Sequence, residues 1–154
     1  MTDVHWPPGW GPEHCDSFVN HERLVAAAPP DAVFGHLTAP GEWPRWQRGT
    51  TGVQAEGELA VGSAFLVVTA LHTLDGIVGE LERPERFGWI AVSDGLSFYQ
   101  SWLLLAEPGD RTRVHFQEAS RGPSASLRAT RRLDETGEWL ASLDMVSYRD
   151  YHDR

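Results

Sequence analysis

Glu118 is the strongest candidate for acid–base chemistry in the sequence. It ends a run in which Val114 and Phe116 alternate with polar residues. Because alternate residues of a strand face opposite sides of the sheet, these three side chains share one face, and the apolar pair predicts that it points inward. Burial penalises an ionised carboxylate, so an inward Glu118 can act as a general acid or base near neutral pH. The alternative is a strand-end glutamate in water.

Gln100 is the second unusual residue, because it shares a predicted strand face with Phe98, Trp102 and Leu104. A buried amide without a partner costs a few kcal/mol. We therefore expect Gln100 either to bond a neighbouring side chain or to bind a carbonyl of a ligand. By the same alternation, Tyr99 faces outward.

His72 and Arg23 are two further candidates for the chemistry. His72 ends an apolar run whose two faces are equally apolar, so alternation does not decide whether it points inward. An inward His72 would form an acid–base pair with Glu118, whereas a strand-end histidine is more often exposed. An inward Arg23 would bind a carboxylate or enolate oxygen, and the alternative is a surface ion pair.

The composition excludes several classes of protein. All 13 basic residues are arginine, which rules out a lysine Schiff base, pyridoxal phosphate attached to lysine and a P-loop lysine. The seven histidines lack the spacing of a zinc site, and we expect no metal and no cofactor. The net charge of −9 opposes nucleic-acid binding, since the arginines are scattered except for Arg128, Arg131 and Arg132.

Size and cysteine content indicate one intracellular domain. The 154 residues suffice for a single core, and the one cysteine, Cys15, cannot form an internal disulfide. The sequence lacks a run of about 18 apolar residues and the pattern of a signal peptide. We expect a cytoplasmic protein without a membrane span, either a monomer or a homodimer.

The apolar periods predict a strand, two short helices, six further strands and a long helix. The first strand covers 18–27, the short helices cover 30–37 and 40–47, and Trp43 and Trp46 lie in the core. The later strands cover 52–56, 63–72, 76–82, 86–93, 97–106 and 112–120, with hairpin turns at Asp75-Gly76 and Asp94-Gly95.

The two ends of the chain have different patterns. Residues 1–15 are rich in proline and glycine and predict a flexible arm, although Trp6 or Trp10 would alternatively close over a pocket as a lid. Residues 124–151 predict one amphipathic helix, whose apolar stripe is Leu127, Leu133, Leu140, Leu143 and Val146. Gly137 lies on or beside this stripe, where it either leaves space above the sheet or kinks the helix.

Several segments together carry a resemblance to a known family. AAPPDAVFGHLTAPGEWPRW, VGSAF at 61–65, VGELERPERFGW at 78–89, and the stretch from Trp102 through GDRTRVHF to Gly122 occur in this order. They resemble the START-like polyketide cyclase/dehydrase and lipid-transport superfamily over residues 18 to about 150. The resemblance implies an α+β helix-grip fold over 16–154, in which a curved antiparallel sheet wraps the last helix.

The resemblance also implies an internal cavity for a hydrophobic small molecule, with two possible functions. One is a cofactor-free enzyme that cyclises or dehydrates a polyketide-like substrate; the other is a non-catalytic carrier or sensor of a lipid or polyketide. An interaction module would need an exposed apolar patch, for which Trp43/Trp46 is the candidate. For the enzyme, the predicted catalytic residues are Glu118, Arg23 and His72, and the predicted substrate-binding residues are Gln100, Trp102, Phe116, Trp89, Phe98 and Gly137.

Overall fold

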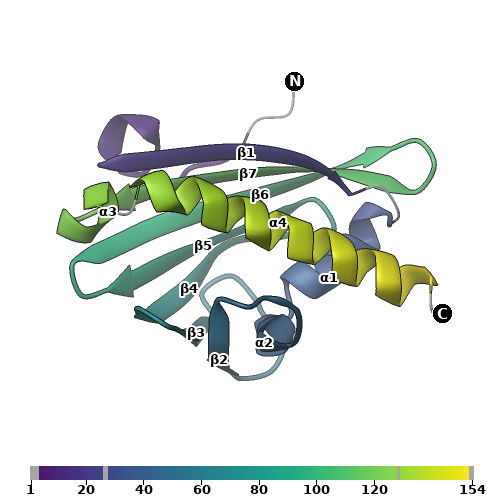
Figure 1. Ribbon diagram of the computed structural model, residues 1–154, viewed down its shortest axis with the longest axis horizontal. Helices are drawn as coiled ribbons and strands as arrows, with labels where there is room; N and C mark the ends of the chain where they lie inside the picture. The colour runs from purple at the N-terminus through teal and green to yellow at the C-terminus, as the bar shows by residue number, and fades with distance from the viewer. Residues whose placement is uncertain (1–3, 26–27, 128, 153–154) are drawn as a thin grey trace.

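The computed structural model describes residues 4–25, 28–127 and 129–152, which form an antiparallel sheet crossed on one face by a long helix (Figure 1). The strands are β1 (Ser17–Val25), β2 (Thr50–Ala55), β3 (Ala64–Thr69), β4 (Thr73–Glu82), β5 (Arg86–Ser93), β6 (Leu96–Glu107) and β7 (Arg111–Arg121). Their order across the sheet is β1-β7-β6-β5-β4-β3-β2. The sequence-based prediction of an α+β helix-grip fold is confirmed.

Two helices lie between β1 and the edge strand β2, and two more follow the last strand, β7. They are α1 (Pro30–Leu37), α2 (Trp43–Trp46), α3 (Pro123–Leu127) and α4 (Ala129–His152), with 3-10 turns η1 (Pro12–His14) and η2 (Pro40–Glu42). Helix α4 lies across the inner face of the sheet, and α1 and α2 close one end of the space between them (Figure 1). Residues 26 and 27, which end the predicted first strand, lie outside the described residues.

The turn predicted at Asp94-Gly95 is correct, and the one predicted at Asp75-Gly76 is wrong. Gly95 joins β5 to β6 with a φ of 71°. The β3–β4 turn instead falls at 70–72, where the Thr69 backbone N–H donates to the His72 carbonyl over 2.8 Å. Gly76 lies within β4 because its neighbours need the space: a β-carbon there would come within 3.1 Å of the Phe65 and Trp89 rings.

The outer face of β6 is covered by the start of the chain. The ring of Tyr99, which points outward as predicted, lies 5.8 Å from the Trp6 ring and 6.4 Å from the Trp10 ring, measured between centroids. The Arg121 guanidinium packs 4.0 Å above the Trp10 ring. These contacts place both tryptophans on the sheet face opposite α4, so they do not close over the space beneath that helix.

Trp43 and Trp46 lie in or against the core rather than in an exposed patch. Trp43 is fully buried and its Nε1 donates to the Leu37 carbonyl over 3.2 Å. The half-buried Trp46 packs edge-on against Trp139 at 5.2 Å between ring centroids. The core prediction for this pair is confirmed, and the segment does not provide the apolar surface that an interaction module would need.

The C-terminal region, predicted as one helix over 124–151, is helical on both sides of residue 128. It forms α3 and α4, and Arg128 between them lies outside the described residues. Leu140, Leu143 and Val146 are buried as expected. Leu127 is 88% exposed and Leu133 is 51% exposed, so these two do not belong to the buried stripe. Arg132, a charged residue near the start of α4, is buried.

Gly88 is the position where the outer-face packing is most sensitive to a side chain. A β-carbon at Gly88 would lie 2.7 Å from Cζ of Tyr99, well inside van der Waals contact. We expect Gly88→Ala to lower the free energy of unfolding by about 1–3 kcal/mol, because it forces Tyr99 away from the strand. Urea denaturation measures this change.

The matched control is Gly35→Ala, in the interior of α1 with open space around the new methyl group. It is expected to stabilise the protein by up to about 1 kcal/mol, since alanine favours a helix interior. Equal effects of the two substitutions would show that Tyr99 does not constrain Gly88.

Candidate functional site

A buried ion pair joins the sheet to the helix. Glu118 on β7 is completely buried, as predicted from the strand alternation, and faces Arg132 of α4. The Arg132 Nε donates to Glu118 Oε2 over 2.7 Å, and Nη2 donates to Oε1 over 2.9 Å. Two parallel N–H···O bonds of this kind are the strongest geometry for an arginine–carboxylate pair.

Gln100 on β6 extends this pair into a network with a defined direction. Its Nε2 donates to Glu118 Oε1 over 2.9 Å, and its Oε1 accepts from Trp89 Nε1 at 2.9 Å and Trp102 Nε1 at 3.2 Å. An indole nitrogen can only donate, so the amide oxygen of Gln100 must face the two tryptophans. Glu118 Oε1 therefore accepts from Gln100 as well as from Arg132.

The charged form of Arg132 is stabilised by its two carboxylate neighbours, Glu118 and Glu135. Burial alone would lower the pKa of the Arg132 guanidinium, but attraction and hydrogen bonding to Glu118, and then to Glu135, raise it above its ordinary value. Glu135 accepts from Arg132 Nη1 over 3.3 Å, and its side chain is 37% exposed. The pair Glu118–Arg132 consequently remains charged inside the protein, while Glu135 stands nearer the solvent.

A cavity of about 510 Å³ lies beside this network, between the sheet, α2 and α4. Its walls are mostly aromatic and aliphatic, and Gln100 and Arg132 of the network are among its polar lining residues. The aromatic members are Trp43, Trp89, Phe98 and Trp139, and the polar members include Gln47, Thr69, His72, Gln100, Ser124, Arg131, Arg132, Glu135 and Glu138. Glu118 is absent from this lining and lies behind Gln100 and Arg132.

The structure brings together some of the predicted site residues. Gln100, Trp89, Phe98 and His72 line the cavity. Trp102 and Phe116 are buried next to it, 4.6 Å apart between ring centroids, but they are not among the lining residues.

Two predicted residues lie elsewhere. Gly137 faces β1, where an added β-carbon would lie 3.7 Å from Nε2 of His21, and it does not line the cavity. Arg23 forms an ion pair with Asp144 of α4 over 3.0 Å, with 40% of its side chain exposed. This is the surface pairing that stood as the alternative for Arg23, and it keeps the guanidinium away from Glu118.

Sequence reasoning missed Arg132, Glu135 and Trp139 as members of the site. A signal for Arg132 exists, because it lies two helical turns before Leu140 and therefore on the same buried face. A charged residue in phase with an apolar stripe indicates a buried partner, and the inward Glu118 supplies one.

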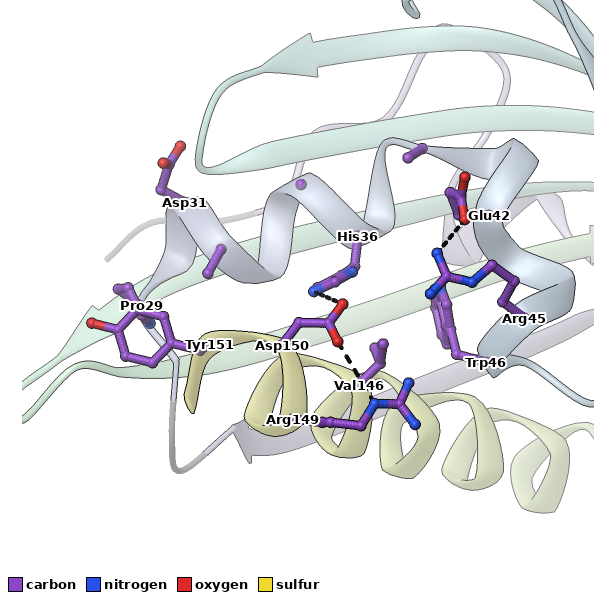
Figure 2. A pocket seen from close by; sticks show the side chains of 13 residues that line it. Pro29, Asp31, His36, Glu42, Arg45, Trp46, Val146, Arg149, Asp150 and Tyr151 are labelled. Atoms are coloured by element: carbon purple, nitrogen blue, oxygen red, sulfur yellow. Dashed lines mark hydrogen bonds and ion pairs between the residues drawn. The ribbon is translucent and has the colours of Figure 1, made fainter. Parts of the chain in front are cut away.

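A second, shallower groove of about 370 Å³ lies between α1, α2 and the end of α4 (Figure 2). Its charged side chains pair with one another: His36 with Asp150 at 3.7 Å, Arg149 with Asp150 at 3.6 Å, and Arg45 with Glu42 at 2.6 Å. None of the residues predicted for the site lines this groove.

The fold, with a cavity between the sheet and the long helix, defines a protein of the START-like, helix-grip kind. A family model described as polyketide cyclase / dehydrase and lipid transport matches residues 19–143, and the chain belongs to this family. A search of curated proteins gives no match.

Solved structures of this fold resemble the protein over most of its length. A hypothetical protein from Helicobacter pylori has a TM-score of 0.87 and 24% identity, covering 96% of this chain and 97% of its own. The Zhui aromatase/cyclase from Streptomyces sp. R1128 has a TM-score of 0.72 and 13% identity, with 86% and 93% covered. A START superfamily protein from Mycobacterium smegmatis has a TM-score of 0.70 and 12% identity, with 86% and 97% covered.

Within the described part of the chain, no helix combines the length and apolar character needed to cross a membrane.

The buried ion pair makes a direct prediction for stability. Arg132→Met leaves the Glu118 carboxylate buried without its cation, and we expect a loss of about 3–5 kcal/mol in the free energy of unfolding. Adding Glu118→Gln removes the unpaired charge, so the double variant should regain most of this loss. Urea denaturation of the wild type, both single variants and the double variant measures the coupling. Additive effects of the two substitutions would contradict the pairing.

Proposed function

We propose that the protein is a cofactor-free enzyme of the polyketide cyclase/dehydrase type. It binds a hydrophobic, carbonyl-bearing small molecule in the cavity beneath α4 and assists ring closure or loss of water. The observation that carries the proposal is the position of the polar network: one side of an aromatic cavity presents the side chains of Gln100 and Arg132, both fixed by Glu118.

The size and lining of the cavity suit such a substrate. Its volume of about 510 Å³ falls within the range of small-molecule sites, which are mostly apolar with a few directed polar groups. Trp43, Trp89, Phe98 and Trp139 supply flat apolar walls against which an aromatic or polyene carbon skeleton would pack. Holding a flexible chain in a folded conformation is itself a large part of the catalysis of an intramolecular reaction.

The chemistry needs a proton acceptor and donors for a developing enolate. Removal of an α-proton places negative charge on a carbonyl oxygen, which N–H groups of Gln100 and Arg132 would stabilise. Both Glu118 oxygens already accept hydrogen bonds from Arg132 and Gln100, with Ser120 Oγ 3.4 Å from Oε2. We therefore give Glu118 the role of positioning the donors.

The proton acceptor in this proposal is Glu135, which lines the cavity. It takes the α-proton, and the resulting enolate carbon attacks a second carbonyl of the same molecule to close the ring. His72, which lines the same cavity, protonates the new alkoxide from its imidazolium form. Loss of water then transfers the remaining α-hydrogen to the neutral His72 and the proton held by Glu135 to the departing hydroxyl, which returns both groups to their starting states.

A carrier of hydrophobic ligands is the second candidate function. The specific observation in its favour is that the buried carboxylate has its hydrogen bonds satisfied by protein groups alone. A cavity of this kind needs no acid–base pair to hold a lipid or polyketide.

Product analysis separates these two functions. The wild type is incubated with fractionated hydrophobic metabolites of the source cells and the mixture is analysed by liquid chromatography and mass spectrometry. We expect a compound to be converted into an isomer or into a product lighter by one water. Glu135→Gln should slow this conversion by about 100-fold or more, because it removes the proton acceptor.

Two further variants serve as references. Glu58→Gln changes an exposed glutamate in the segment between β2 and β3 and should leave the rate unchanged. Glu118→Gln should lower the rate through misplacement of Gln100 and Arg132. If a compound instead co-purifies unchanged with all variants, the protein is a carrier and the catalytic roles are wrong.

A further inference from the structure

Gln100 is held in one orientation by two tryptophans, and this has a consequence for the kind of ligand that the cavity accepts. The amide oxygen has two lone pairs, and the Trp89 and Trp102 indole N–H groups occupy both. A reversed amide would place its NH₂ group against two donors and its oxygen against the Glu118 carboxylate. That orientation loses three hydrogen bonds and adds repulsion, so Gln100 does not reverse to suit a ligand.

On the wall formed by Gln100 and Arg132, the fixed orientation leaves only donor capacity, while Glu135 and Glu138 line the cavity as separate acceptors. Nε2 of Gln100 carries two hydrogens, of which one bonds to Glu118 Oε1. The guanidinium of Arg132, which also lines the cavity, has five N–H groups and no acceptor. A ligand atom that meets this wall therefore finds N–H groups and no lone pair directed by Gln100.

We propose that Trp102 and Trp89 determine ligand specificity through Gln100, so that the ligand group that meets the Gln100 amide is a hydrogen-bond acceptor such as a ketone or enolate oxygen. This inference rests on the proposed function, because it concerns the same cavity, and it adds the chemical class selected there. Trp102 is a positioning residue: it is buried beside the cavity without lining it, and it acts on the ligand only through the Gln100 amide.

Three neutral tricyclic compounds of nearly identical shape test this selection. Fluorenone presents a carbonyl oxygen, carbazole presents an N–H group at the same ring position, and fluorene presents neither. Isothermal titration calorimetry gives their dissociation constants with the wild type. We expect fluorenone to bind about tenfold or more tightly than carbazole, since the carbonyl oxygen accepts from Gln100 and Arg132, whereas a carbazole N–H bonds only away from this pair, to Glu135 or Glu138.

Trp102→Phe separates positioning from a merely structural role. The substitution keeps an aromatic ring against Phe116 but removes one of the two indole donors that fix the amide. The ratio between the carbazole and fluorenone dissociation constants should fall at least about threefold, while the fluorene dissociation constant stays within about twofold of the wild type. A general loss of cavity shape would weaken fluorene binding as well.

Trp10→Phe is the matched control, because Trp10 lies on the outer face of the sheet and should leave all three dissociation constants unchanged. Equal binding of fluorenone and carbazole by the wild type, or an unchanged ratio in Trp102→Phe, would overturn the inference. Selective fluorenone binding by a protein that converts no metabolite would uphold it and remove only the catalytic proposal. Failure of all three compounds to bind would overturn both this inference and the assignment of the cavity as a ligand site.

Discussion

The ion pair between Glu118 and Arg132 is the interaction on which the site depends. Burying either charge alone is costly, and the cost is offset only because the two groups meet in a two-point geometry inside the same space. The pair connects β7 to the first turns of α4, and so sets the position of the helix that covers the cavity. The pair also positions two neighbours, because Gln100 bonds to Glu118 and Glu135 bonds to Arg132.

The aromatic residues of the cavity both pack the surrounding elements together and orient a polar side chain. Trp43 contacts the rings of Phe65, Trp89 and Trp139, with centroid distances between 5.1 and 5.9 Å, and so links α2, the sheet and α4. Trp89 at the same time donates its indole N–H to Gln100. Because aromatic packing and amide orientation share this residue, the shape of the cavity and the direction of its polar groups are coupled.

The N-terminal segment packs on the outer face of the sheet, behind the strands that carry the site residues. Residues 4–15 place Trp6 and Trp10 over Tyr99, whose ring crosses the backbone at Gly88. As a result β6 is buried on both faces over most of its length, and Gln100 lies on a strand with little freedom to shift. A rigid strand under a directed amide is what preorganised stabilisation of a charged oxygen requires.

The sequence alone determined which faces of β6 and β7 are buried, because alternation is a local property of the backbone: Glu118 and Gln100 point inward and Tyr99 outward, as two-residue periodicity requires. It also located Gly95, whose positive φ is a local demand of a tight turn. Only the tertiary structure decided that Gly76 makes room for two rings, that Arg23 bonds Asp144, and that Gly137 faces His21. These features depend on which distant segments meet. These contacts arise because α4 and the N-terminal segment pack on opposite faces of the sheet. A local sequence pattern does not predict contacts between distant segments.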